Sequence, residues 1–523
     1  MKIGYTFLIA TAVVFTVSCT NTAQNEEQME KNYKGCIDVP QESQPICEEY
    51  VSEKLATFKP IKLEEDLSGL TDNDKKMIEI FKEVGKIADD LFWRQAIGNK
   101  DLFLSSIKDD VVKDFAMINY GPWERLNDNE PYLEGYGSKP AGANFYPVDM
   151  TKEEFDNFED ANKTSGYTLI RRDENGNLKS VWYHEAYKTE ITKMASLLKE
   201  AATYSDDANF KKYLELRAEA LLTSDYQKSD FAWMEVRDSR LDLVVGPIEN
   251  YEDGLYGYKC AFETFILKKD VEWSAKLSKY VGMLPALQAS LPVPEEYKKE
   301  VPGTDSDINV YDAIMYYGDC NAGSKTIAIN LPNDEEVHLA CGSRKLQLKN
   351  SMKAKFDNIV MPIAEVLIDE SQLKHVTFDA FFENTTFHEV GHGMGIKTTI
   401  DGKQSVREAL KEQYSAIEES KADIMGLYLV TKLYEQGEIT SGELMDNFVT
   451  FTVGFFRSCR FGAASSHGKA NMLRFNYFED AGAFKRNPKT GKYTIDFDKM
   501  YEAMINSVQQ ILTIQGDGDY EAA

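Results

Sequence analysis

The sequence predicts an α+β protein that is mainly helical, and three patterns support this fold class. Apolar residues recur at helical spacing in the first half of the chain, most regularly over 67–95. Strand-like alternation is concentrated in the middle, over 239–270 and 324–334. Long helical patterns then return from 350 to 514. With 523 residues, the chain is long enough for two or three domains, or for one large enzyme with two lobes.

The N-terminal residues predict export. Lys2 is followed by an apolar run over 3–17 and then by Ser18 and Cys19. The run is too short to span a membrane as a helix, and the layout is typical of a secretory signal. Because it ends on Ser-Cys, it resembles a bacterial lipoprotein signal, in which Cys19 is lipidated and holds the protein on the periplasmic or cell-surface side of a membrane. An ordinary cleaved signal with a chance cysteine is the alternative.

The next elements follow in order along the chain. Residues 20–62 are polar with few long apolar runs, so they are predicted to form a tether between the lipid anchor and the folded body. Thr71, with Asp74 three residues later, marks the expected start of the first long helix. Further helices are predicted over 180–204 and 209–223.

The charge of the chain limits its partners. The formal net charge is −27, which argues against binding nucleic acid because phosphates need stripes of Lys and Arg. An acidic protein instead favours cationic ligands, such as peptides with a free amino terminus. The sequence gives no indication of the oligomeric state.

A candidate metal site begins with two of the six histidines, which lie one helical turn apart in the sequence HEVGH. Positions four residues apart share a helix face, so His388 and His392 can bind the same ion. Glu389 lies at the edge of that face, where it can deprotonate a water molecule held by the metal. The alternative is an exposed helix with chance polar residues.

A catalytic zinc site also needs a third protein ligand and an open fourth position. A second helical stretch supplies candidates in Glu418, Glu419 and Asp423. Glu419 and Asp423 are again four residues apart, so one can bind the metal while the other orients a ligand imidazole. Two matched helices so close in sequence predict one zinc ion per chain.

These motifs, HEVGH and EESKAD, resemble those of the dipeptidyl peptidase III family of zinc metallopeptidases. Three further segments resemble the family in the same order along the chain: GPIENYEDGLYGYKCAFETF, INLPND and SSHGKANMLRFNYFEDAG. The resemblance implies two lobes around a wide cleft, with the zinc site on the helical lobe and a smaller mixed sheet in the other. The expected divisions are a lipoprotein-type signal (1–19), a polar tether (20–62), a sheet-containing lobe with N-terminal helices (63–270), the first part of the helical lobe (271–310), a return to the sheet-containing lobe (311–355) and the helical catalytic lobe with the zinc site (356–523).

The resemblance implies a role for each matching residue. In the metal site, His388, His392 and Glu419 would bind zinc, and Glu418 and Asp423 would hold the two histidines in place.

At the substrate, Glu389 would activate water, while Tyr251 and His467 would donate hydrogen bonds to the oxyanion. Three residues would hold the free ammonium group of the peptide: Glu249, Asn330 and Asn333. Taken alone, each has an ordinary structural explanation, such as packing for the tyrosine and a turn for the asparagines. Their joint occurrence in family order favours the functional roles.

Two features separate the chain from the best-known members of that family. Those members have one more residue between the two histidines, and the plain HExxH form resembles the branch found as the C-terminal part of plant Nudix-linked proteins. A Nudix box is absent from the sequence, so no diphosphatase activity is expected. Family members usually continue beyond the point where this sequence ends, with basic residues that grip the far end of the peptide, so an effect on substrate length is expected.

The predicted function is zinc-dependent release of N-terminal dipeptides from short peptides outside the cytoplasm. One alternative is a zinc peptidase of other specificity, an aminopeptidase or endopeptidase; the cluster of Glu249, Asn330 and Asn333 argues against it. Another is a non-catalytic, lipid-anchored peptide-binding protein. Glu389 and His467 argue against that alternative, because binding alone needs neither.

Overall fold

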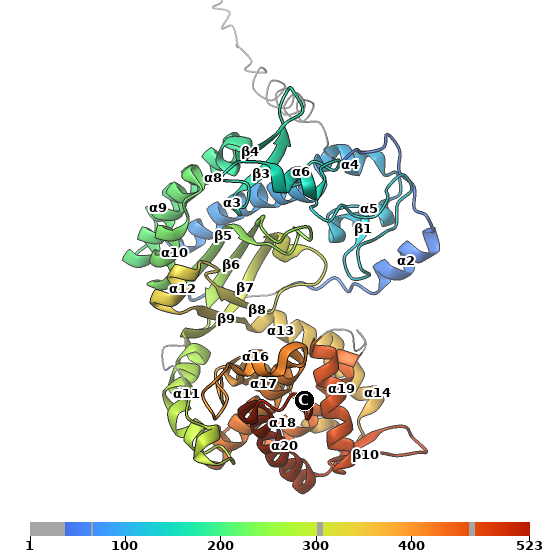
Figure 1. Ribbon diagram of the computed structural model, residues 1–523, viewed down its shortest axis with the longest axis vertical. Helices are drawn as coiled ribbons and strands as arrows, with labels where there is room; N and C mark the ends of the chain where they lie inside the picture. Colours follow the sequence, from blue (N-terminus) through green and yellow to red (C-terminus); the bar gives the residue numbers. More distant parts are fainter. Residues whose placement is uncertain (1–36, 64–65, 301–306, 460–465) are drawn as a thin grey trace, which may run out of the picture.

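The computed structural model describes residues 37–63, 66–300, 307–459 and 466–523, which form two lobes, one above the other in Figure 1. The predicted signal, Cys19 and the first part of the tether lie outside these residues. Within the described residues, none of the helices combines the length and the apolar character needed to cross a bilayer.

A mixed sheet closes the bottom of the upper lobe, as predicted (Figure 1). The strand order is β5-β6-β7-β9-β8, in which β7 and β9 are parallel and the other neighbours antiparallel. The first two strands are almost continuously buried because helices cover the sheet. The bounds are β5 (Leu241–Glu249), β6 (Ala261–Lys269), β7 (Asp307–Gly318), β8 (Ala328–Leu331) and β9 (Arg344–Leu348).

The helix that packs on this sheet, α3 (Asp72–Ala96), starts where the sequence predicts. The Thr71 side chain accepts from the Asp74 amide at 3.1 Å, and the Asp74 side chain accepts from the Thr71 amide at 2.8 Å. The remaining elements of this lobe are α2 (Glu48–Ala56), α4 (Lys100–Ser106), α5 (Asp110–Asn119), β1 (Trp123–Glu124), β2 (Glu130–Pro131), α6 (Lys152–Asn157), β3 (Thr168–Arg172), β4 (Leu178–Trp182), α7 (Tyr183–Ala186), α8 (Lys188–Ala202), α9 (Ala208–Thr223), α10 (Gln227–Met234) and α12 (Glu335–Cys341).

The lower lobe is helical and has its own hydrophobic core. Strand β7 links the two cores, because Ile308 and Val310 belong to the lower core while Tyr311 and Ala313 belong to the upper. The elements of the lower lobe are α11 (Val271–Ala289), α13 (Lys349–Lys355), η3 (Phe356–Val360), α14 (Met361–Leu367), α15 (Phe378–Gly391), α16 (Val406–Leu410), α17 (Tyr414–Glu435), α18 (Leu444–Cys459), α19 (Ser466–Asp480), β10 (Phe484–Arg486), β11 (Tyr493–Ile495) and α20 (Phe497–Asp517).

The second half of the predicted tether differs from the expectation, because residues 37–62 pack against the upper lobe. Val51 of α2 is fully buried, and α2 lies against α5. Ser43 and Pro45 form β-bridges with Ile107 and Leu133.

Scattered apolar side chains of this segment, such as Tyr50, Leu55 and Phe58, also pack against the upper core, and Lys54 pairs with buried Glu124 at 3.3 Å. Isolated apolar residues of this kind form no long apolar run in a polar stretch.

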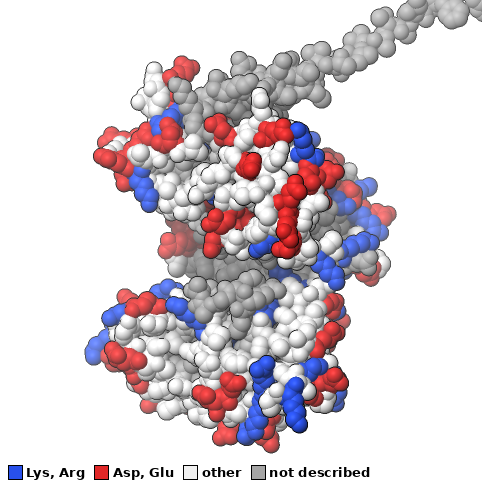
Figure 2. Space-filling model, turned by 90° about the vertical axis from the view of Figure 1, so that its right-hand side faces the viewer, with Lys and Arg blue, Asp and Glu red and all other residues white. Residues whose placement is uncertain are grey.

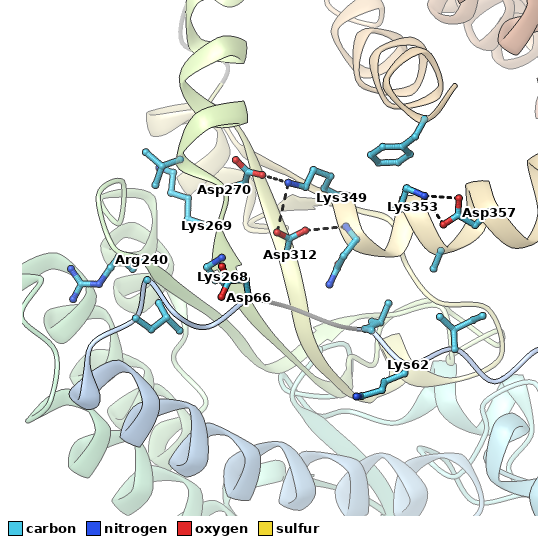
Figure 3. A pocket seen from close by; sticks show the side chains of 18 of the residues that line it. Lys62, Asp66, Arg240, Lys268, Lys269, Asp270, Asp312, Lys349, Lys353 and Asp357 are labelled. Atoms are coloured by element: carbon cyan, nitrogen blue, oxygen red, sulfur yellow. Dashed lines mark hydrogen bonds and ion pairs between the residues drawn. The ribbon is translucent and has the colours of Figure 1, made fainter. Parts of the chain in front are cut away.

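Where the chain passes between the lobes, charged side chains line a cavity of about 1020 Å³ (Figure 3). Lys349, at the start of α13, forms an ion pair with Asp270, which caps the first turn of α11. Its Nζ also lies 3.8 Å from Asp312 Oδ2 on β7. One ammonium group therefore ties together three segments that join the sheet to the helical lobe.

We expect Lys349→Met to lower the free energy of unfolding by about 1–3 kcal/mol, because it removes a cation that pairs with two largely buried carboxylates. Lys353→Met is the matched control in the same cavity, since the Lys353–Asp357 pair is about half exposed and is worth at most about 0.5 kcal/mol. Denaturant unfolding measures the free energy of unfolding of both variants. Equal losses in the two variants would contradict the role of Lys349 in tying the three segments together.

Candidate metal centre and substrate pocket

The site depends on a close crossing of α15 and α17 in the lower lobe. A Cβ atom added at Gly391 would lie 2.6 Å from the carbonyl oxygen of Ala422, and one added at Gly426 would lie 2.8 Å from the His388 amide nitrogen. The two glycines therefore allow a backbone separation that larger residues forbid. This crossing brings the HEVGH segment of α15 against the EESKAD segment of α17.

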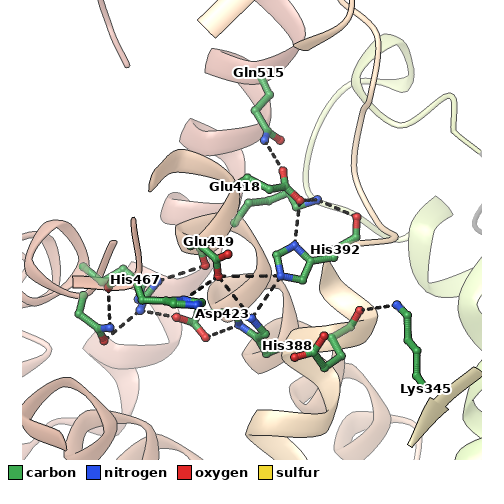
Figure 4. Close-up of polar contacts among 12 residues, drawn as sticks. Lys345, His388, His392, Glu418, Glu419, Asp423, His467 and Gln515 are labelled. Atoms are coloured by element: carbon green, nitrogen blue, oxygen red, sulfur yellow. Dashed lines mark hydrogen bonds and ion pairs between the residues drawn. The ribbon is translucent and has the colours of Figure 1, made fainter. Parts of the chain in front are cut away.

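At the crossing, the structure brings His388, His392 and Glu419 together (Figure 4). The two Nε2 atoms are 3.2 Å apart, and they lie 3.5 and 3.9 Å from Glu419 Oε2. Ligands at about 2.0–2.1 Å from a tetrahedral zinc ion are themselves about 3.3 Å apart. The spacing therefore fits three ligands of one such ion.

The opposite ring nitrogens show why these atoms need a cation between them. His388 Nδ1 is 2.5 Å from Asp423 Oδ1, and His392 Nδ1 is 3.1 Å from Glu418 Oε1. Because a carboxylate accepts hydrogen bonds, each Nδ1 donates its proton to a carboxylate, which leaves Nε2 as the nitrogen that binds a metal once it carries no proton. Two nitrogen lone pairs and a carboxylate oxygen then converge on one point, which is the chemistry of a metal site.

The orienting carboxylates are held by residues that the sequence analysis missed. Arg474 of α19 is buried and forms an ion pair with Asp423. Lys421 Nζ lies 2.8 Å from Glu418 Oε1, and Gln515 of α20 donates to Glu418 Oε2 at 2.9 Å. Lys421 stands one turn after Glu418 and was detectable by spacing, whereas Arg474 and Gln515 come from distant helices without a local signal.

These contacts set the protonation of the site. Burial would raise the pKa of Glu418, but hydrogen bonds from His392, Lys421 and Gln515 and the charge of Lys421 hold it at about 2. Burial would raise the pKa of Asp423 too, and Arg474 and His388 hold it well below its usual range. Burial would lower the pKa of His388, but Asp423 raises it to about 9. Metal binding must therefore displace a proton from His388 at neutral pH.

His467, in the first turn of α19, lies at the same site. Its Nδ1 is 2.9 Å from Glu419 Oε2, and its side chain is 68% exposed. The contact with Glu419 raises the pKa of His467, which favours the protonated, hydrogen-bond-donating form. Glu389, the expected general base, is half-buried on α15 beside His388.

The expected ammonium-binding residues lie on the upper lobe. Glu249 follows a β-bulge at the end of β5, and its Oε2 accepts from Asn333 Nδ2 at 3.2 Å. Burial raises the pKa of Glu249, while the bond from Asn333 lowers it. Glu249, Tyr251 and Asn333 line one cavity of about 540 Å³. Asn330 is exposed on the edge strand β8.

The predicted site residues therefore form two groups, a metal group on the lower lobe and a substrate group on the upper. Tyr251 belongs to the second group and is 81% exposed, next to the carboxylate of Glu249. On the face shown in Figure 2, acidic side chains are prominent on the upper lobe, although both lobes carry side chains of both signs. The net charge of −27 favours cationic ligands for the chain in general.

Comparisons with known proteins show which sequences this chain resembles. The model of "Peptidase family M49" matches residues 159–404. Nudix hydrolase 3 of Arabidopsis thaliana is 35% identical, over 90% of this chain and 69% of the plant protein. Dipeptidyl peptidase 3 of Rattus norvegicus is 24% identical over 40% of this chain and 28% of the rat protein.

Two solved structures are similar over nearly the whole chain. The structure of DPP III from Caldithrix abyssi has a TM-score of 0.85 and 40% identity, covering 90% of this chain and 92% of that one. The structure of dipeptidyl-peptidase III from Corallococcus sp. strain EGB has a TM-score of 0.72 and 35% identity, with 90% of each chain covered. The likeness includes two lobes around a cleft.

We expect Gly426→Ala to weaken metal binding at least tenfold and to destabilise the fold by about 1–3 kcal/mol, because the added methyl forces α15 and α17 apart. Gly454→Ala is the matched control: Gly454 lies within α18, a Cβ there meets no atom within 4 Å, and the change should stabilise the helix by up to about 1 kcal/mol. Zinc titration and thermal unfolding test both variants. Unchanged zinc affinity in Gly426→Ala would contradict the role of the crossing.

The zinc affinity should also depend on pH. Because His388 has a pKa of about 9 without metal, the apparent affinity should fall roughly tenfold for each pH unit below about 9. Competition with a chelator of known proton affinity measures this slope. Asp423→Asn should lower the zinc affinity about 10- to 100-fold. Because Asp423 raises the pKa of His388, the pH below which the zinc affinity falls should also be lower in this variant. A zinc affinity that stays constant between pH 7 and 8.5 would contradict the assignment of His388 as a ligand that loses a proton when the metal binds.

Proposed function

The chain belongs to peptidase family M49, the dipeptidyl peptidase III family, and from this premise we propose that it is a zinc-dependent enzyme that releases dipeptides from the free N-termini of short peptides. It is a peptidase hydrolase. The observation that carries the finer proposal is the convergence of His388, His392 and Glu419 on one point of the lower lobe, together with a separate pocket around Glu249 on the upper lobe.

Zinc, when bound, supplies Lewis-acid polarisation of a carbonyl and lowers the pKa of a water molecule. Glu389 stands beside the ligand face and takes the proton from the attacking water, later giving it to the leaving amine. His467 and Tyr251 donate hydrogen bonds to the carbonyl oxygen as negative charge develops on it. The contact of His467 with Glu419 supports this role, because it favours the protonated imidazole.

The substrate ammonium group is held by Glu249, Asn330 and Asn333. An ammonium group has three donors, and a carboxylate with two amide oxygens provides three acceptors. The Asn333 amide nitrogen already donates to Glu249, which leaves its amide oxygen for the ligand. Two extended residues span about 7 Å, so the distance between this pocket and the metal in the closed state selects the second peptide bond.

The two groups lie on different lobes, so the reactive geometry needs the lobes to close on the peptide. The upper lobe brings the ammonium pocket and Tyr251, and the lower lobe brings the metal ligands, Glu389 and His467. Closure also excludes water from the scissile bond, which strengthens every charge interaction there.

For its location we propose export and attachment to a membrane through a lipid on Cys19. Lys2, the apolar run over 3–17 and the Ser18–Cys19 pair support this assignment. Expression of the full-length sequence with Cys19→Ala should move the protein from the membrane fraction to the soluble one, and an unchanged distribution would argue for a different anchor or none.

The function is tested by incubating the protein with one set of short peptides, offered both free and N-acetylated, and identifying products by mass. We expect chelator-sensitive release of dipeptides from the free peptides alone. Glu389→Gln should lower kcat at least 10²-fold while zinc stays bound, because the general base is lost and the ligands are not.

Other outcomes distinguish the alternatives. Cleavage of the acetylated peptides would support a zinc peptidase of other specificity and contradict the ammonium pocket. Peptide and zinc binding without any cleavage would support a non-catalytic peptide-binding protein.

A further inference from the structure

One lysine reaches from the sheet of the upper lobe to the metal-binding helix. Lys345 is the second residue of β9, and its Nζ donates to the carbonyl oxygen of Glu389 at 3.3 Å (Figure 4). Glu389 is the expected general base and follows the ligand His388 directly. The contact therefore joins the two lobes at the residue on which the chemistry depends.

The strand that carries Lys345 is firmly held in the sheet. Its neighbour Arg344 is fully buried on the opposite face of β9, with its Nη2 at 2.7 Å from Asp242 Oδ2 and 2.9 Å from the Tyr311 hydroxyl. Because successive side chains of a strand alternate between faces, this anchor directs Lys345 away from the upper core. The Lys345 side chain therefore extends from a strand whose position in the sheet is fixed by Arg344.

The cross-strand neighbour of Lys345 is Asn330, one of the residues proposed to hold the substrate ammonium. The antiparallel pairing of β8 and β9 places Asn330 directly opposite Lys345. Residues directly opposite in such a pair share one face of the sheet. Asn333 follows at the end of the same edge strand and contacts Glu249. Lys345 therefore lies beside Asn330, which directly precedes the cis Leu331–Pro332 bond and stands three residues before Asn333, and it contacts the backbone of the proposed general base.

The electrostatics agree with this placement. Burial lowers the pKa of Lys345, the negative charge of Glu389 acts in the opposite direction, and the positive charge of Lys397 lowers the pKa further. A half-buried ammonium group on a carbonyl oxygen is a directional, charge-assisted contact. It resists sliding of β9 along α15.

We propose that Lys345 is a positioning residue that sets the distance between the ammonium pocket and the general base, and so the number of residues removed from the substrate. This inference rests on the proposed dipeptidyl-peptidase function. Loss of the contact would let β8 and β9 shift relative to α15, while the ammonium pocket and the metal ligands themselves stay intact. A displacement of about 1 Å at such a site can cost 10²-fold in rate.

The test compares three variants of the zinc-loaded protein with the wild type: K345M, K345R and the control K211M, which removes the same charge from an exposed position on α9. For each protein, kcat, KM, zinc content and the masses of all products are measured on free peptides of mixed length. The wild-type products test the proposed function by themselves, and the variants test this inference.

We expect K345M to lower kcat about 10- to 100-fold, to change KM less than threefold, and to release single residues or tripeptides beside dipeptides. K345R, which keeps a donor at this position, should stay within about fivefold of the wild type and release dipeptides alone. K211M should match the wild type.

Three results would overturn the proposal. The first is K345M with wild-type kcat and dipeptides as its sole products. The second is loss of zinc or folding in K345M together with K345R as slow as K345M, which would give Lys345 a structural role. The third is a rise in KM alone, which would place Lys345 in ground-state binding.

Discussion

The structure depends on how closely α15 and α17 cross. Gly391 and Gly426 remove the side chains that would hold the two helices apart, and only this separation lets a glutamate of α17 approach two histidines of α15. The crossing also sets the second layer of the site, because the same face of α17 supplies Glu418 and Asp423 to the other imidazole nitrogens. A pair of glycines in two helices thus determines a set of five polar side chains.

Charge compensation then keeps these side chains in place. Two buried carboxylates beside a metal would repel Glu419 if they stood alone, and Arg474 and Lys421 offset them from within the lower lobe. On the upper lobe, by contrast, the carboxylate of Glu249 is bonded by the neutral amide of Asn333. In the proposed function this carboxylate receives the substrate's cationic amino group, so the two lobes keep carboxylates of different environments apart.

Sequence spacing was enough for the local features. The four-residue separations in HEVGH and EESKAD predicted ligands that the structure brings together, and the capping box at Thr71 and the mixed sheet were confirmed. Contacts between segments far apart in the sequence could not be predicted from spacing. Arg474, Gln515 and Lys345 reach the site from other elements, and α2 is held by scattered apolar residues and by contacts with Glu124, so neither periodicity nor composition reveals them.

The most direct test of the central claim is X-ray absorption spectroscopy at the zinc edge of the loaded protein. We expect a four-coordinate ion with two imidazole nitrogens, oxygen ligands at about 2.0 Å and no sulfur. The same spectrum of Glu419→Ala should lose one oxygen ligand from the protein and keep both imidazoles. A site with a single imidazole, or with sulfur ligands, would contradict the account of how the two helices build the metal centre.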